Sequence, residues 1–160
     1  MVISDENLEK LKIIGKQIEN FAYLLYYEPH NHNDPLNVRQ AMRDTHLANL
    51  QKNLQAMGEL LQVEPSEDKV LNLQNTLDEV TEKIYTKACW LNSSLQVPRN
   101  NNPKKALAAT ETYYNILLAR VRQLQSLLDR ANALTANNNQ ALLPEAAQHH
   151  SLGTNMVQQP

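Results

Sequence analysis

Two histidines of this chain are placed where they could share a metal ion. His30 and His32 stand one residue apart, and Asp34 follows them. All three lie in a polar stretch bounded by Pro29 and Pro35. Because imidazole nitrogens and carboxylate oxygens are common metal ligands, these side chains are the candidate site of a metal-binding or small-ligand-binding bundle. The competing interpretation is a solvated loop that binds nothing, and we expect no cofactor.

The motifs that usually announce an enzyme are absent. Three scattered glycines cannot build a phosphate-binding loop or a dinucleotide fingerprint, and no nucleophile elbow occurs. The sequence also lacks the paired Glu-x-x-His of di-iron bundles and the Cys-x-x-Cys-His of covalent haem attachment. We therefore predict that the protein is not an enzyme.

The aromatic residues could instead form a binding surface. They are Phe21, Tyr23, Tyr26, Tyr27, Tyr85, Trp90, Tyr113 and Tyr114. Neighbouring residues of a helix point about 100° apart, so two adjacent tyrosines cannot both face the centre of a core. Because tyrosine and tryptophan are favoured at interaction hot spots, exposed members of this set are candidate contacts for a partner.

Four segments must position these residues, and each carries an apolar stripe with helical spacing. The expected helices run from a cap at Ser4 to about Tyr27, over 36–61, over about 70–95 after a cap at Ser66, and over 103–134. The expected loops are Pro29–Pro35, Val63–Ser66 and Val97–Pro103. We expect no sheet, because no window alternates apolar and polar residues over more than a few positions.

Short loops between four helices predict an all-α fold, an antiparallel up-down-up-down four-helix bundle over residues 1–134. Residues 135–160 are polar and lose the periodicity, so we expect a flexible C-terminal tail. The alternative architecture is a helical hairpin that pairs with a second chain. In the up-down-up-down order all eight aromatic residues would meet at one pole, where the predicted partner-binding residues are Tyr23, Tyr26, Tyr27, Trp90, Tyr113 and Tyr114.

The charge distribution bears on the kind of partner. The net charge of −2 combines −5 over residues 1–98, +4 over residues 99–134 and −1, from Glu145, over residues 135–160. A basic last helix that complements acidic neighbours explains this pattern, so we do not expect a nucleic-acid interface. No basic start followed by an apolar run marks a secretion signal, and no apolar stretch is long enough to span a membrane. We expect a cytoplasmic protein, or one delivered by a route independent of a signal peptide.

These observations predict a non-enzymatic helical bundle that acts by protein–protein interaction. An adaptor, an export chaperone, an inhibitor or a small effector would fit. Two alternatives stay open, namely the metal-binding or ligand-binding bundle and a coiled-coil assembly protein. The sequence identifies neither the partner nor the oligomeric state.

Overall fold

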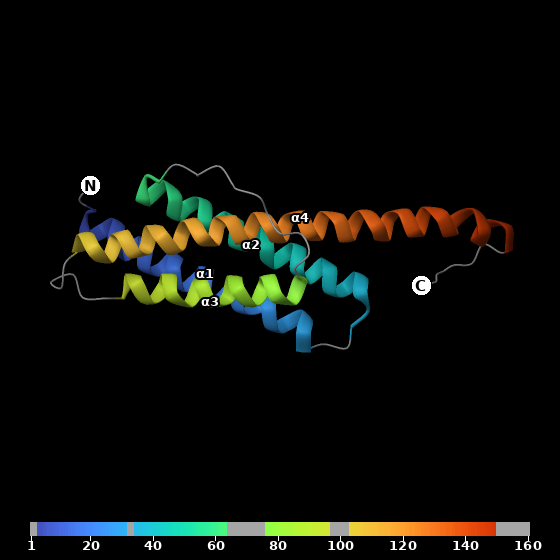
Figure 1. The fold of residues 1–160 in the computed structure, drawn as a ribbon, viewed down its shortest axis with the longest axis horizontal. Helices are drawn as coiled ribbons and strands as arrows, with labels where there is room; N and C mark the ends of the chain where they lie inside the picture. The colour runs from blue at the N-terminus through green and yellow to red at the C-terminus, as the bar shows by residue number, and fades with distance from the viewer. Residues whose placement is uncertain (1–2, 32–33, 64–75, 97–102, 150–160) are drawn as a thin grey trace. The chain divides into compact units, whose positions relative to one another are not determined.

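The described part of the chain is almost entirely α-helical. The computed structural model describes residues 3–31, 34–63, 76–96 and 103–149, with side chains described for 3–29, 34–63, 76–96 and 107–134. The helices are α1 (Asp5–Asn31), α2 (Leu36–Leu61), α3 (Leu77–Leu95) and α4 (Pro103–His149). No strand occurs in the described residues. The predicted all-α four-helix bundle is therefore confirmed (Figure 1).

The chain divides into two compact units, Met1–Leu127 and Leu128–Pro160. The first unit is the bundle, which contains α1, α2, α3 and α4 as far as Leu127. The prediction that the last helix ends at Leu134 is wrong, because α4 continues to His149. Extending an existing helix needs no new nucleus, so a helix can outlast the apolar stripe that packs its first part. Whether the polar C-terminal region packs against anything stays a prediction.

The helix starts follow local capping chemistry. Ser4 caps α1 as predicted, because its Oγ accepts a hydrogen bond from the Asn7 N–H at 3.1 Å. Thr76 caps α3 in the same way, with 3.1 Å between its Oγ1 and the Glu79 nitrogen. The third helix was expected to begin near Val70, but α3 begins at Leu77, and the predicted cap at Ser66 lies outside the described residues.

The helix ends were predicted well for α2 and α3, but not for α1 or α4. Both α2 and α3 end where expected, at Leu61 and Leu95. Helix α1 was expected to stop near Tyr27, but it runs through Pro29 to Asn31. A proline in the last turn removes a single helical hydrogen bond, and the ring of Pro29 is buried, which offsets part of that loss.

The core of the bundle is built from the predicted stripes. Its largest fully buried side chains within the first unit are Leu11, Ile18, Leu25, Leu47, Leu50, Leu54, Met57, Leu61, Ile84, Leu91, Leu117 and Leu124. Arg43 also lies in the core stripe of α2, only 5% exposed, and its Nη2 donates to Asp78 at 2.8 Å. Burial lowers the pKa of Arg43, and the nearby carboxylate of Asp78 opposes that effect.

The contacts between helices fix their directions. The end of α1 lies beside α2, with Glu28 Oε1 at 3.3 Å from His46 Nε2, so α1 and α2 are antiparallel. The side chain of Asn92 donates to Glu19 at 3.3 Å, and Leu95 packs near Gly15, which makes α1 and α3 antiparallel as well. It follows that α2 and α3 run in the same direction (Figure 1).

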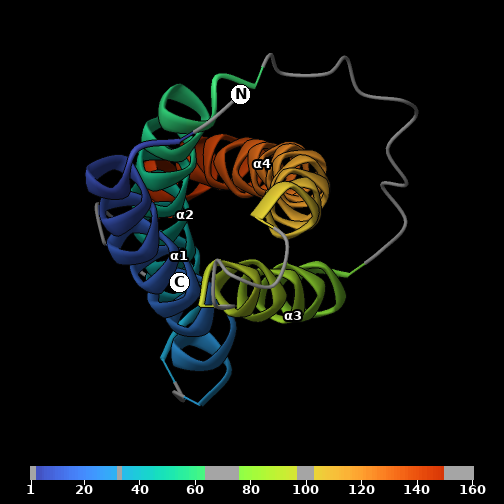
Figure 2. The ribbon, with the colours of Figure 1, turned by 90° about the vertical axis from the view of Figure 1, so that its left-hand side faces the viewer.

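The predicted up-down-up-down order is therefore wrong, and the observed order is up-down-down-up. Arg43 and Asp78 stand near the starts of their helices, which lie at the same end of the bundle. Fifteen residues, 62–76, join α2 to α3. They can reach about 50 Å, more than the roughly 39 Å length of α2, so the chain can return before α3 starts. Viewed end-on, α1 lies between α2 and α3 (Figure 2).

Candidate interaction surfaces

The helix directions separate the aromatic residues that the sequence placed at one pole. Two groups of aromatic side chains lie on the surface. The tyrosine cluster comprises Tyr23, Tyr26 and Tyr27 of α1 with Tyr85 of α3, and the tryptophan pair comprises Trp90 of α3 with Tyr113 of α4. Tyr114 belongs to neither group, because it is only 3% exposed.

The rings of the tyrosine cluster are in mutual contact. Tyr27 lies 4.7 Å from Tyr23 and 4.6 Å from Tyr26, measured between ring centroids. Tyr85 lies 5.7 Å from both Tyr23 and Tyr27. These are the tilted and edge-to-face geometries that aromatic rings prefer. Tyr23 is 45% exposed and the other three side chains are half-buried. Neither member of the adjacent pair Tyr26 and Tyr27 is therefore fully buried.

Polar groups hold the hydroxyl ends of the cluster. Tyr85 shares a hydrogen bond with Cys89, which raises the pKa of Tyr85 to about 12. Burial raises the pKa of Cys89, although the same hydrogen bond opposes the rise. Desolvation by burial raises the pKa of Tyr26, and the negative charge of Glu82 adds to the rise. The Tyr26 hydroxyl is also hydrogen-bonded to that carboxylate. The phenols of Tyr26 and Tyr85 are therefore un-ionised at neutral pH, and the rings are neutral aromatic surfaces.

The tryptophan pair lies where α3 meets α4. The ring centroids of Trp90 and Tyr113 are 5.7 Å apart in an edge-to-face arrangement. Lys87 Nζ stands 4.0 Å above the tryptophan ring, which is cation–π geometry. Trp90 is 48% exposed, so the pair is a second exposed aromatic surface.

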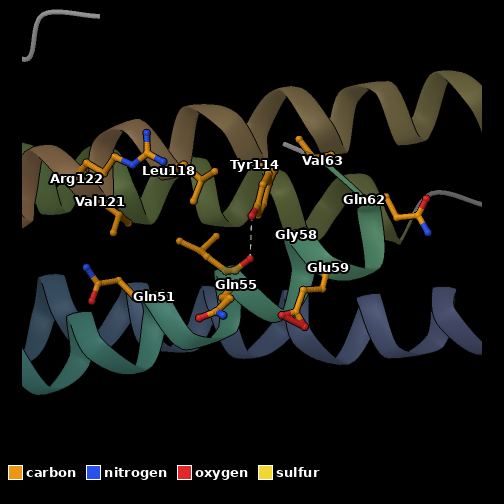
Figure 3. A pocket seen from close by; sticks show the side chains of 11 residues that line it. Gln51, Gln55, Gly58, Glu59, Gln62, Val63, Tyr114, Leu118, Val121 and Arg122 are labelled. Atoms are coloured by element: carbon orange, nitrogen blue, oxygen red, sulfur yellow. Dashed lines mark hydrogen bonds between the residues drawn. The ribbon is translucent and has the colours of Figure 1, made fainter. Parts of the chain in front are cut away.

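A groove of about 640 Å³ lies between α2 and α4, and the sequence did not predict it (Figure 3). Tyr114 crosses it from α4, and its hydroxyl donates to the Leu54 carbonyl at 3.0 Å. Leu118 and Val121 line the apolar part of the groove, and Gln55 lies on its α2 side. The groove depends on α2 and α4 being neighbours, which the predicted helix order could not specify.

The metal hypothesis is not tested by the structure. Asp34 is described and half-buried, but the side chain of His30 and the whole of His32 lie outside the described residues. Among the residues that are described, no group of three or more His, Cys, Asp or Glu side chains could hold a metal ion. The candidate set of His30, His32 and Asp34 therefore stays a prediction.

Within the described helices, none combines the length and the apolar character needed to cross a bilayer. Comparisons with protein-family models, with curated proteins and with solved structures give no match.

Proposed function

We propose that the protein acts by protein–protein interaction and that the tyrosine cluster is its docking surface. The observation that carries the proposal is the contact of four tyrosine rings at the surface, with Tyr23 45% exposed. Tyrosine offers a large contact area at a small entropic cost, which is why it is favoured at hot spots. The two helices that carry the cluster are anchored by buried neighbours such as Leu25 and Ile84, so the rings are presented on a rigid support.

A tyrosine that serves only to fill the core of this molecule has a different environment from the tyrosines of the cluster. Tyr114 fills the interior, where it is 3% exposed and bonded through its hydroxyl to the Leu54 carbonyl. Tyr23 instead has an exposed ring, which packs against the rings of Tyr27 and Tyr85. This contrast favours recognition over packing as the role of the tyrosine cluster.

The role that follows is that of an adaptor, an export chaperone, an inhibitor or a small effector. The exposed tryptophan pair is a second candidate surface for the same kind of partner. The metal-binding or ligand-binding bundle and the coiled-coil assembly protein remain the alternative proposals. A metal titration followed at His30 and His32 tests the first, and the dependence of oligomeric state on protein concentration tests the second.

The decisive experiment measures binding of a partner isolated from the native source. Tyr23→Ala should weaken that binding by about 1–2 kcal/mol, as hot-spot truncations do. Its thermal stability should change far less than that of Leu117→Ala, a core change expected to cost about 2–5 kcal/mol.

Tyr113→Ala is the matched control on the other aromatic surface. If it abolishes binding while Tyr23→Ala has no effect, the tryptophan pair is the docking surface and the tyrosine cluster is not. If both variants bind as the natural protein does, neither surface recognises the partner and the proposal fails.

A further inference from the structure

Carboxylates stand at both ends of the tyrosine cluster. Glu19 of α1 acts electrostatically on Tyr85 and Cys89 toward the middle of the bundle. Glu82 of α3 is hydrogen-bonded to the Tyr26 hydroxyl, and Asp78 acts on the same tyrosine from one turn earlier in α3. The rings therefore lie within a negative potential that comes from two helices.

The charges of Glu19 and Glu82 are not neutralised within the bundle. Asp78 is paired with the buried Arg43. Glu19 accepts a hydrogen bond from the neutral amide of Asn92 at 3.3 Å. In the part of the chain that the structure describes, no salt bridge joins Glu19 or Glu82 to a cation, although Lys16 and Lys83 are close to them in sequence.

The face of an aromatic ring is itself negative, so the rings and the carboxylates favour the same kind of group. A guanidinium can stack on a tyrosine ring and pair with a carboxylate at the same time, and an ammonium can make both contacts more weakly. We propose that the segment which docks on the tyrosine cluster is cationic, with arginine or lysine side chains lying on the exposed rings and pairing with Glu19 and Glu82. This inference rests on the proposed function and names the chemistry of the partner.

The test uses the full chain and a defined probe. A peptide of alternating arginine and glycine is titrated at low ionic strength while the tyrosine ring signals are followed by NMR. The matched peptide carries citrulline in place of arginine, which keeps the shape and removes the charge. We expect the arginine peptide alone to shift the signals of Tyr23, Tyr27 and Tyr85, to leave buried Tyr114 unchanged, and to lose affinity as salt is added.

Charge variants then locate the interaction. The double substitution Glu19→Gln with Glu82→Gln should weaken peptide binding by about tenfold, which corresponds to about 1.4 kcal/mol. The control pair Glu9→Gln with Glu59→Gln changes the net charge equally but lies away from the cluster, on exposed positions of α1 and α2. It should leave the affinity within about twofold of the natural protein.

Three results would overturn the inference. The arginine peptide could leave the cluster signals unchanged, the citrulline peptide could bind equally well, or the control pair could weaken binding as much as the test pair. A native partner that needs Tyr23 but is indifferent to Glu19→Gln with Glu82→Gln would refute the cationic partner and leave the proposed function intact. Such a partner would dock through apolar contacts instead.

Discussion

The hydroxyls of Tyr114 and Tyr85 have different hydrogen-bond partners, and the pKa of each phenol is raised for a different reason. Tyr114 donates to a backbone carbonyl in the interior, and burial raises its pKa. Tyr85 lies at the edge of a surface cluster, where its hydrogen bond to Cys89 stabilises the un-ionised phenol. The thiol of Cys89 is half-buried between that phenol and the charge of Glu19. The side chain of Cys89 therefore tunes Tyr85 and is itself kept protonated.

We predict that Tyr85 ionises at about pH 12, well after a tyrosine with an ordinary pKa of 10.0. The pKa of Tyr85 in the folded protein is raised above its value in the unfolded chain. The contribution of Tyr85 to the free energy of unfolding is therefore fully present below about pH 10. That contribution is lost as the pH rises from about 10 to about 12. A spectrophotometric titration of tyrosinate should show a late ionisation that is missing from Tyr85→Phe, and Cys89→Ala should move it toward pH 10. A late ionisation that is unaffected by Cys89→Ala would show that the hydrogen bond is not its cause.

At this scale the sequence predicted exposure better than contacts. The 100° rotation between neighbouring residues correctly implied that Tyr26 and Tyr27 cannot both be buried in the core. The sequence did not indicate that Cys89, which is half-buried, shares a hydrogen bond with Tyr85 one helical turn earlier. Side chains three or four residues apart lie on the same face of a helix, which is why Tyr85 and Cys89 meet.

At the scale of the helix, Gly58 explains how α2 and α4 approach each other. Its lack of a side chain leaves room for the Tyr114 ring, since a Cβ at Gly58 would overlap the tyrosine hydroxyl oxygen. Helix propensity alone predicts that alanine at this interior position would stabilise the protein by about 1 kcal/mol. The contact with Tyr114 predicts the opposite sign.

We predict that Gly58→Ala lowers the free energy of unfolding by roughly 1–3 kcal/mol, the usual cost of overpacking. Urea unfolding measures this directly. In a Tyr114→Phe background the hydroxyl is gone, so the same glycine substitution should cost clearly less. If Gly58→Ala stabilises the protein instead, the Tyr114 ring must be able to move aside at little cost, and the groove between α2 and α4 must be deformable.

Helix boundaries were predictable where a proline at the boundary agreed with the apolar periodicity. Pro35 precedes α2 and Pro103 opens α4, and both starts were expected. The start of α3 was missed because apolar spacing continues upstream from Leu77 to Val70, which suggested an earlier start. The better signal was Thr76 followed three residues later by Glu79, the pattern of a capping box, and the structure uses that threonine as the cap.

For the whole bundle, one misplaced helix start changed the predicted order of the helices. A short loop after α2 would force α3 to run back antiparallel, whereas a fifteen-residue connection allows it to return and run parallel. The core stripes are the same in both orders, so hydrophobic periodicity could not distinguish them. The order nevertheless decides which surface residues meet, and it separates the tyrosine cluster from the tryptophan pair.

The final prediction tests this order by crosslinking in a Cys89→Ser background. Arg43→Cys combined with Asp78→Cys should give rapid intramolecular linkage by a short bismaleimide, because the two natural side chains are 2.8 Å apart. Replacing both partners leaves no unpaired buried charge, so the pair should fold. The control combines Arg43→Cys with Ser93→Cys, an exposed position fifteen residues further along α3 and so roughly 22 Å away along its axis.

Mass spectrometry of the digested protein identifies which pair is linked, and circular dichroism checks that each variant is helical. In the observed order the first pair links and the control does not. In the up-down-up-down order the start of α2 would face the end of α3, so the control would link and the first pair would not. Linkage of the control pair alone would therefore restore the single aromatic pole, and with it Trp90 and Tyr113 would return to the docking surface of the tyrosine cluster.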